Sequence, residues 1–272
     1  MSTSFLRSQG WTRQHVEQAI AAGTLHRVRR GWFAREGAEA SVVAAVAAGG
    51  CVSCADALRL HGAWVPESLG RGHVRRSRRA RSGGRAACRV LGVEPPVEHG
   101  VDDVETAFRC LLGCGTREDI VVVADSLLHL RLATRDELER WVADGPARAI
   151  KAVRWVDAAE SGLETMTRVR LRSHRVRVRP QVWIEDMRVD LVVGDVLVIE
   201  CDGGEHHASW AAQAADRARD RRLTTLGYVV VRLTYRQIVD DWDAVERDLL
   251  ALVRAHRRRT RRNVRESGPS RR

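Results

Sequence analysis

Apolar residues in the last third of the chain follow the alternation of strands and helices. The predicted elements are, in order, a helix ending near residue 173, strands over 176–184, 188–193 and 196–202, a helix over 211–226, a strand over 228–233 and a final helix. The run VLVIECD is continuously apolar before it ends in charge, which is typical of a central strand buried on both faces. The pattern predicts a mixed α/β domain with the element order αβββαβ.

The first 36 residues combine helical spacing with a basic hairpin pattern. A short helix is expected over 4–9, and Thr12 is placed to cap a second helix that ends at Gly23. The following segment TLHRVRRGWFA predicts two short strands joined by a turn at Arg30 and Gly31. We expect a small winged helix-turn-helix.

Residues 37–152 carry mainly helical patterns and no catalytic constellation. The predicted helices run over 40–48, 53–61, 104–112, 119–130 and 134–143. The segment from Arg71 to Arg89 is a basic run with Gly and Ser, which is by default a solvated loop or hairpin. We therefore expect a scaffold region rather than a second active site.

Charge favours a polyanionic partner. The formal net charge of the 272-residue chain is +11, and Lys151 is the only lysine. Arginine forks match pairs of phosphate oxygens, so the bias suits nucleic acid. A genomic preference for Arg codons explains part of the excess of Arg over Lys, but it leaves the net charge unexplained. The Arg-rich end over 255–272 is expected to be a disordered basic tail.

The sequence shows neither a membrane-spanning run nor a signal-peptide core, so a cytoplasmic protein with reduced thiols is expected. Cys51 and Cys54 form one CxxC, and Cys110 and Cys114 lie one helical turn apart. Four thiolates at such spacings allow a zinc site. Both pairs lie in apolar helical surroundings, where cysteine more often serves as a small buried residue.

Carboxylates gather at the predicted strand ends between residues 188 and 207. Asp190, Glu200 and Asp202 belong to the segment RVDLVVGDVLVIECDGGEHH. Like charges raise each other's pKa and oppose folding unless a cation neutralises them. Oxygen ligands of this kind suit Mg²⁺ or Mn²⁺. Taken singly, an Asp at a strand start is more often a turn former, so the argument depends on the joint spacing.

The same segment resembles a known nuclease superfamily. The order αβββαβ, with Glu164 on the first helix and Glu200 about ten residues after Asp190, is similar to the PD-(D/E)XK nucleases. Within that superfamily, VDLVVGDVLVIECDGGEHH and DRARDRRLTTLGYVVVRLT resemble a domain-of-unknown-function group related to very-short-patch repair endonucleases. The resemblance covers residues 160–252 and implies a restriction-endonuclease-like fold.

The resemblance also implies roles for single residues. The implied metal ligands are Asp190, Glu200 and Asp202, and Glu164 would orient a water or a second ion. The superfamily's usual lysine is missing after Lys151, and the resemblance places His206 or His207 as the general base. Gln181 and Arg219 are candidates for holding the scissile phosphate. The acidic positions Asp216 and Asp220 are expected to pair with arginines.

The N-terminal pattern aGxLxRVxRGxY resembles the winged-helix domain of abortive-infection type antitoxins over about 25 residues, with Phe33 in place of the usual Tyr. The candidate DNA contacts of this region are Arg13, Gln14 and Gln18 on the second helix, and Arg27, Arg29 and Arg30 on the wing. The alternative is a packing module with a solvated basic face.

These features predict a DNA endonuclease that uses a divalent metal and is positioned by an N-terminal DNA-binding domain. The predicted parts are 1–36, 37–152, 153–254 and 255–272. The expected partner is nucleic acid, with double-stranded DNA favoured, and a monomer and a homodimer are both left open. The alternative is a non-catalytic DNA-binding regulator, such as an antitoxin-like repressor, that keeps a degenerate nuclease fold.

Overall fold

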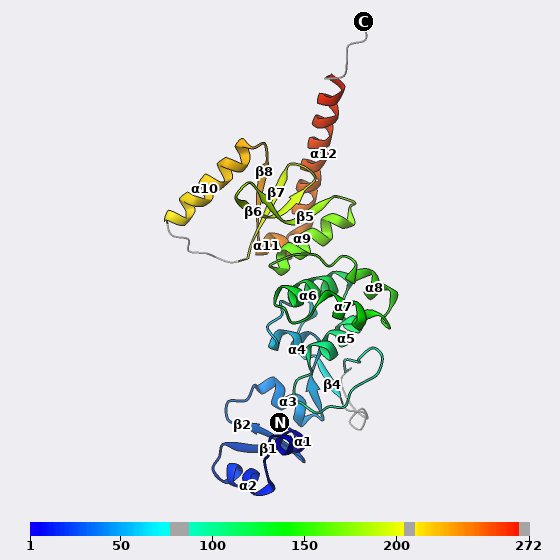
Figure 1. The fold of residues 1–272 in the computed structure, drawn as a ribbon, viewed down its shortest axis with the longest axis vertical. Helices are drawn as coiled ribbons and strands as arrows, with labels where there is room; N and C mark the ends of the chain where they lie inside the picture. Colours follow the sequence, from blue (N-terminus) through cyan, green and yellow to red (C-terminus); the bar gives the residue numbers. More distant parts are fainter. Residues whose placement is uncertain (77–86, 204–209, 267–272) are drawn as a thin grey trace. The chain divides into compact units, whose positions relative to one another are not determined.

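The computed structural model describes the backbone of residues 1–76, 87–203 and 210–266 (Figure 1). The chain divides into two compact units, which we call the N-terminal unit (Met1–Val156) and the C-terminal unit (Asp157–Arg272). The sequence placed the start of the nuclease domain at residue 153, close to this boundary. The finer division at residue 36 stays a prediction.

The N-terminal unit begins with two short helices and a hairpin. Helix α1 (Thr3–Ser8) and helix α2 (Arg13–Ala21) precede the antiparallel strands β1 (Leu25–Arg29) and β2 (Trp32–Arg35). The hydroxyl of Thr12 accepts the backbone N–H of His15, which caps α2 as the sequence predicted. A small core forms from Leu6, Leu25 and Phe33, with Met1, Val16, Ala19 and Ile20 packed against it.

The rest of the N-terminal unit is a helical region with one small ribbon. Its elements are α3 (Ala40–Ala47), β3 (Gly50–Val52), α4 (Cys54–Leu60), η1 (Glu67–Leu69), β4 (Val74–Arg76), α5 (Val104–Cys114), α6 (Arg117–His129), α7 (Arg135–Val142) and α8 (Ala147–Val153). Side-chain oxygens of Asp103, Thr116 and Thr134 cap α5, α6 and α7. The antiparallel pairing of β3 with β4 and helix α8 are features that the sequence did not predict.

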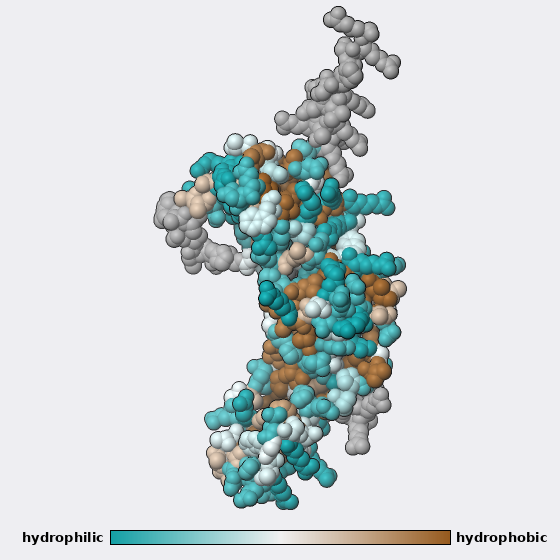
Figure 2. Space-filling view, viewed as in Figure 1, coloured by the Kyte–Doolittle hydropathy of each residue, from teal (hydrophilic) through white to brown (hydrophobic). Residues whose placement is uncertain are grey.

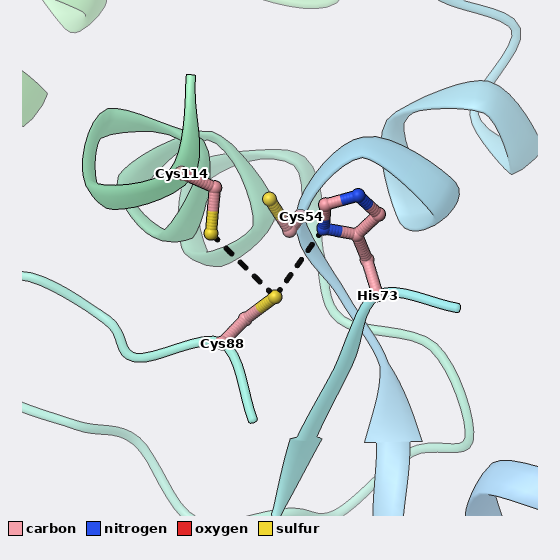
Figure 3. Close-up of side chains that lie close together, drawn as sticks. All are labelled: Cys54, His73, Cys88 and Cys114. Carbon is pink, nitrogen blue, oxygen red and sulfur yellow. Dashed lines mark hydrogen bonds between the residues drawn. The ribbon is translucent and has the colours of Figure 1, made fainter. Parts of the chain in front are cut away.

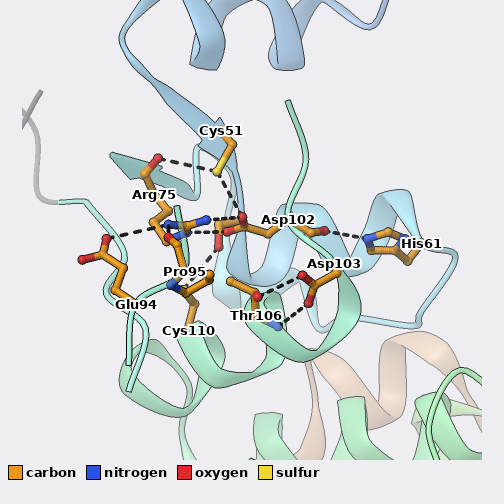
Figure 4. A network of polar contacts seen from close by, with 10 residues as sticks. Cys51, His61, Arg75, Glu94, Pro95, Asp102, Asp103, Thr106 and Cys110 are labelled. Atoms are coloured by element: carbon orange, nitrogen blue, oxygen red, sulfur yellow. Dashed lines mark hydrogen bonds and ion pairs between the residues drawn. The ribbon is translucent and has the colours of Figure 1, made fainter. Parts of the chain in front are cut away.

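The ribbon changes the interpretation of the basic run that starts at Arg71. Arg75 lies on β4 with only 1% of its surface exposed, so this part of the run is not a solvated loop. Residues 77–86, the middle of the run, lie outside the described residues. A buried guanidinium requires a charged partner, and Asp102 provides it (Figure 4).

The C-terminal unit is built on a four-stranded mixed sheet. Strands β5 (Val178–Ile184), β6 (Met187–Val193) and β7 (Leu197–Asp202) are antiparallel neighbours, and β8 (Val229–Thr234) lies parallel to β7. The strand order is therefore β5-β6-β7-β8. Antiparallel strands need only tight turns, and Gly194, with a φ of 61°, supplies the turn between β6 and β7.

Helices complete this unit in the order that the sequence predicted, with one additional short helix that the sequence did not predict. Helix α9 (Gly162–Ser173) contacts β5, β6 and β7, and α10 (Trp210–Thr225) is the crossover that a parallel β7 and β8 pair requires. Short α11 (Tyr235–Val239) contacts α9 and β8. The core around the sheet comprises Ile184, Met187, Val189, Val192, Val198 and Leu223.

The last helix differs from the sequence prediction. Helix α12 (Trp242–Glu266) continues well past residue 254, where a disordered tail was expected to begin. Leu249 and Val253 are buried and anchor its first half. Arginine has a high helix propensity, so the Arg-rich segment extends the helix once that half is docked. Residues 267–272 lie outside the described residues.

The visible surface is mainly hydrophilic over α1, α2 and the β1–β2 hairpin, and hydrophobic residues gather over the middle helices (Figure 2). None of the helices among the described residues has both the length and the apolar character needed to cross a membrane.

Candidate active site

Asp190 and Glu200 meet across the central strand pair of the C-terminal unit. Leu191 pairs with Ile199 in the β6–β7 register, so the next position outward sets Asp190 opposite Glu200 on the same face of the sheet. A hydrogen bond between the two carboxyl groups contributes to the pKa of both. Two carboxyl groups in contact are close enough for one ion to bind both.

Burial makes this pair unusually basic. Glu200 is 6% exposed, and burial, followed by the charge of Asp190, raises its pKa to about 7. Burial likewise raises the pKa of Asp190, although the hydrogen bond from the backbone N–H of Cys201 at 2.8 Å opposes the shift. Near neutral pH the pair therefore holds a proton that a cation can replace.

Glu164 belongs to the same electrostatic group. It lies 4% exposed in the first turn of α9, where the hydroxyl of Ser161 caps the helix. Its Oε2 accepts the side-chain amide of Gln181 at 2.6 Å and the backbone N–H of Glu160 at 3.1 Å. Burial, followed by the charge of Asp190, raises the pKa of Glu164. The structure thus brings together three of the acidic residues that the sequence singled out.

Gln181 has a strained backbone at this site. Its φ is 51°, a left-handed conformation that is costly for a residue with a Cβ. Its neighbours Pro180 and Val182 pair with Leu191 and Val189, so Gln181 stands opposite Asp190 in the register of β5 and β6. Such strain costs about 1–3 kcal/mol and persists only where surrounding contacts hold it, as at many functional sites.

Arginines surround the carboxylates. Arg219 of α10 lies 2.9 Å from Glu200 through its Nη2 and also donates to the backbone carbonyl of Arg188. Arg232 of β8 is opposite Glu200 in the parallel register. It pairs with Asp220 at 3.0 Å, with Asp216 at 3.8 Å and with Asp202 at 3.9 Å. Asp216 and Asp220 thus pair with arginine, as expected from the sequence.

The third predicted metal ligand, Asp202, does not complete a three-ligand cluster with the carboxylate pair. The Asp202 side chain is 45% exposed and faces Arg232. In the described part of the C-terminal unit, no three potential ligand atoms of His, Cys, Asp or Glu lie within 4.8 Å of one another. His206 and His207 lie outside the described residues. The candidate site is thus a two-carboxylate contact with Glu164 close by.

Arg232 is the member of this site that sequence reasoning missed. A lone arginine inside the apolar run VVVRLT is a usable signal, because a charged side chain that is only 32% exposed favours acidic partners. The parallel register then decides which partners it meets, and the sequence alone does not specify that register.

The N-terminal candidate residues lie on α2 and on the hairpin. Arg13, Gln14, Gln18, Arg27 and Arg30 are exposed, and Arg29 is half-buried. The Arg27 guanidinium lies over the Phe33 ring and that of Arg29 over the Trp32 ring, each at 5.2 Å from the ring centroid. Arg13 forms an ion pair with Glu17 at 2.8 Å. Their role in binding nucleic acid stays a prediction.

A family model supports a restriction-endonuclease-like fold for the C-terminal unit. Residues 164–253, which are less than half of the chain, match the restriction-endonuclease-like family model REase_MTES_1575. Among solved structures, the catalytic domain of homing endonuclease I-Bth0305I is similar at 19% sequence identity. The structural match covers 35% of this chain and 95% of that domain, and its TM-score is 0.31. No curated protein matches the chain.

Proposed function

We propose that the protein is an endonuclease that hydrolyses phosphodiester bonds of double-stranded DNA with a divalent metal ion. The observation that carries this proposal is the buried contact of Asp190 with Glu200 on adjacent strands, inside the segment that matches the restriction-endonuclease-like family. Burying two carboxylates together has no structural benefit by itself, because each destabilises the charged form of the other. A cation removes that penalty.

The donor set fits Mg²⁺ or Mn²⁺. All candidate ligand atoms are carboxylate oxygens, and Glu200 Oε1 is buried and receives no hydrogen bond, although Arg219 lies close to it. Asp190 and Glu200 would hold the ion, and Asp202 would support it from the end of β7. When bound, such an ion stabilises the developing charge on the phosphate and lowers the pKa of water.

The remaining residues would bind and orient the reacting groups. Arg219 would exchange its contact with Glu200 for the scissile phosphate, since a guanidinium matches two phosphate oxygens. Gln181 and Glu164, fixed by their 2.6 Å hydrogen bond, would position the attacking water. Because no lysine follows Lys151, His206 or His207 would accept the proton from that water.

Cleavage of supercoiled plasmid and of a short duplex tests this proposal. We expect strand breaks with Mg²⁺ or Mn²⁺ and none with EDTA, with full recovery when the metal is restored. Replacing His206 and His207 by alanine, singly and together, should lower the rate about 10²-fold if either is the base. Metal-independent cleavage, or no cleavage of duplex, mismatched and single-stranded substrates, would contradict the proposal.

The metal requirement should depend on pH. Since the pKa of Glu200 is raised to about 7, the metal must displace a proton from the pair below that pH. The Mg²⁺ concentration for half-maximal cleavage should therefore rise up to tenfold per pH unit below about 7 and level off above it. Metal titrations at about pH 6 and about pH 8 measure this, and equal requirements at both would contradict the assignment.

We also propose that the exposed basic residues of α2 and the hairpin contact the DNA backbone. Replacing Arg13 and Arg30 by alanine should weaken duplex binding and reduce the slope of log affinity against log salt by about 0.9 for each lost contact. Arg7→Ala on α1 is the matched control and should bind like the unaltered protein. Fluorescence anisotropy in Ca²⁺, over a series of salt concentrations, measures both quantities.

A non-catalytic DNA clamp is the second candidate. The ion pair of Arg219 with Glu200 favours it, because a guanidinium can neutralise a carboxylate without any metal. A clamp predicts DNA binding that EDTA leaves unchanged and no strand breaks at any metal concentration. The endonuclease predicts metal-dependent breaks that disappear when Asp190 or Glu200 is replaced.

A further inference from the structure

Three cysteines and one histidine converge in the N-terminal unit, outside the carboxylate site (Figure 3). Cys54 is the first residue of α4, and Cys114 is the last of α5. His73 directly precedes β4, and Cys88 lies in the segment that returns from it. Their ligand atoms all lie within 4.8 Å of one another. Four distant points of the chain thus present three sulfurs and one nitrogen to one small volume.

Two of the separations between these ligand atoms fit the edges of a coordination tetrahedron. At Zn–S about 2.3 Å and Zn–N about 2.0–2.1 Å, a tetrahedral ion sets neighbouring sulfurs about 3.8 Å apart and sulfur about 3.6 Å from nitrogen. Cys114 Sγ lies 3.7 Å from Cys88 Sγ, and Cys88 Sγ lies 3.4 Å from His73 Nδ1. The two separations match tetrahedral edges, and all four ligand atoms lie within 4.8 Å of one another, so one ion can contact all four after small side-chain adjustments.

The histidine is held in the tautomer that binds a metal. His73 Nε2 lies 2.7 Å from the backbone carbonyl of Leu69, and a carbonyl can only accept, so Nε2 carries the proton. In neutral imidazole Nδ1 then keeps its lone pair, and Nδ1 is the atom that faces the sulfurs. A carbonyl partner on the second ring nitrogen is the usual outer contact of a metal-binding histidine.

The backbone around the cluster is also fixed. Cys54 has a φ of 51°, a left-handed conformation that carries strain in a residue other than glycine. The backbone N–H of Ser53 donates to the carbonyl of His73 at 3.0 Å, and that of Cys88 donates to the carbonyl of Val74 at 2.9 Å. These bonds bring Cys54, His73 and Cys88 together independently of any ion.

Core packing does not account for this arrangement. Cys114 is exposed, and Cys88 and His73 are half-buried, whereas a cysteine used as an apolar residue is enclosed. Cys51 and Cys110 are enclosed in this way. Both are buried, with Cys51 beside Asp102 and with Cys110 Sγ accepting the Ser53 hydroxyl at 3.2 Å. The sequence allowed a zinc site on Cys51, Cys54, Cys110 and Cys114, and this set of ligands is wrong. In each spaced pair, one cysteine belongs to the cluster and the other is buried in the core.

We propose that Cys54, His73, Cys88 and Cys114 bind one structural zinc ion. Thiolate and imidazole ligands in a tetrahedron select Zn²⁺ over the hard cations that suit the carboxylate site. All four positions are taken by protein, so no place remains for water or substrate, and the ion serves the fold. The ion would join the start of α4, the end of α5, and the two segments before and after residues 77–86, which carry His73 and Cys88. The proposal does not depend on the nuclease function.

The unaltered full-length protein provides the first test. Protein purified with zinc in the growth medium should contain about one zinc per chain. Replacement by Co²⁺ should give the visible bands of a tetrahedral site and the charge-transfer bands of thiolate ligation. A strong chelator should lower the melting temperature of the N-terminal unit, and Zn²⁺ should restore it. Zinc-free protein whose melting is insensitive to added Zn²⁺ under reducing conditions overturns the proposal, as does a Cys88 to Cys114 disulfide in the purified protein.

Matched variants identify the ligands. Cys88→Ser and Cys114→Ser should each lower zinc affinity at least about tenfold, and His73→Cys should keep zinc while changing the Co²⁺ spectrum to that of four thiolates. Cys110→Ala, in the same core but outside the cluster, should keep one zinc per chain. Unchanged affinity in both serine variants, or loss of zinc in Cys110→Ala alone, overturns the assignment. If a variant fails to fold, the metal content and Co²⁺ spectrum of the unaltered protein decide.

Discussion

Glu200→Gln should reduce metal-dependent cleavage about a thousandfold, because the variant keeps the shape of the side chain but loses the anionic ligand. Asp190→Asn should behave similarly, since both carboxyl groups would hold the same ion. Single-turnover cleavage of a labelled duplex, at saturating Mg²⁺ and with excess protein, measures this effect free of product release. Asp195→Asn is the matched control. It alters an exposed carboxylate in the turn between β6 and β7 and should cleave like the unaltered protein.

The same variant should stabilise the protein when no metal is bound. Burial raises the pKa of Glu200 from 4.5 to about 7, so the folded state holds a proton that the unfolded state releases between these values. The unaltered protein therefore loses stability as pH rises from 4.5 to about 7, and the loss is complete above that range. Glutamine has no proton to lose. The variant should exceed the unaltered protein by on the order of 2 kcal/mol at about pH 8 in EDTA.

Urea unfolding in EDTA at several pH values checks this second effect. Adding Mg²⁺ should stabilise the unaltered protein and leave Glu200→Gln nearly unchanged, because only the former gains a bound ion. If the variant were less stable at every pH, Glu200 would be a structural residue held by Arg219 rather than a metal ligand. If it cleaved as fast as the unaltered protein, the endonuclease proposal would lose its central residue.

Arg75→Met should destabilise the N-terminal unit by about 3–5 kcal/mol, the usual effect of removing one partner from a buried ion pair. The Arg75 guanidinium donates hydrogen bonds to both carboxylate oxygens of Asp102, at 2.7 and 2.5 Å, and to the carbonyl of Pro95 at 2.7 Å (Figure 4). The Asp102 side chain also accepts from the thiol of Cys51. Without Arg75 the carboxylate is left charged and buried.

Thermal unfolding of the full chain measures this loss. At about 2–4 °C per kcal/mol for a unit of this size, the transition of the N-terminal unit should fall by roughly 10 °C. Arg71→Met, an exposed position in the same basic run, is the control and should shift it little. The double variant Arg75→Met with Asp102→Leu should recover part of the loss, because no charge remains buried. If Arg75→Met lowered the melting temperature no more than Arg71→Met does, the result would contradict a structural role for the ion pair of Arg75 with Asp102.

The order of elements in the C-terminal unit could be predicted because it depends on local sequence. Periodicity and turn residues specify α9, the three antiparallel strands, α10 and β8 to within a few residues. The meeting of Asp190 with Glu200 also follows, since a tight turn at Gly194 leaves one register between β6 and β7. The candidate carboxylate pair was therefore available from the sequence, together with the absence of a lysine nearby.

Long-range packing decided the rest. The partners of Arg232 depend on the parallel register of β8, and helix α12 extends through Arg-rich residues because its first half docks on the unit. Cys54, His73, Cys88 and Cys114 follow no local motif, since their separations reflect the path of the chain through α4, the β3–β4 ribbon and α5. Residue types alone determine which atoms can bind a metal. Only the tertiary structure determines which of them meet, because contacts between distant segments leave no periodic trace in the sequence.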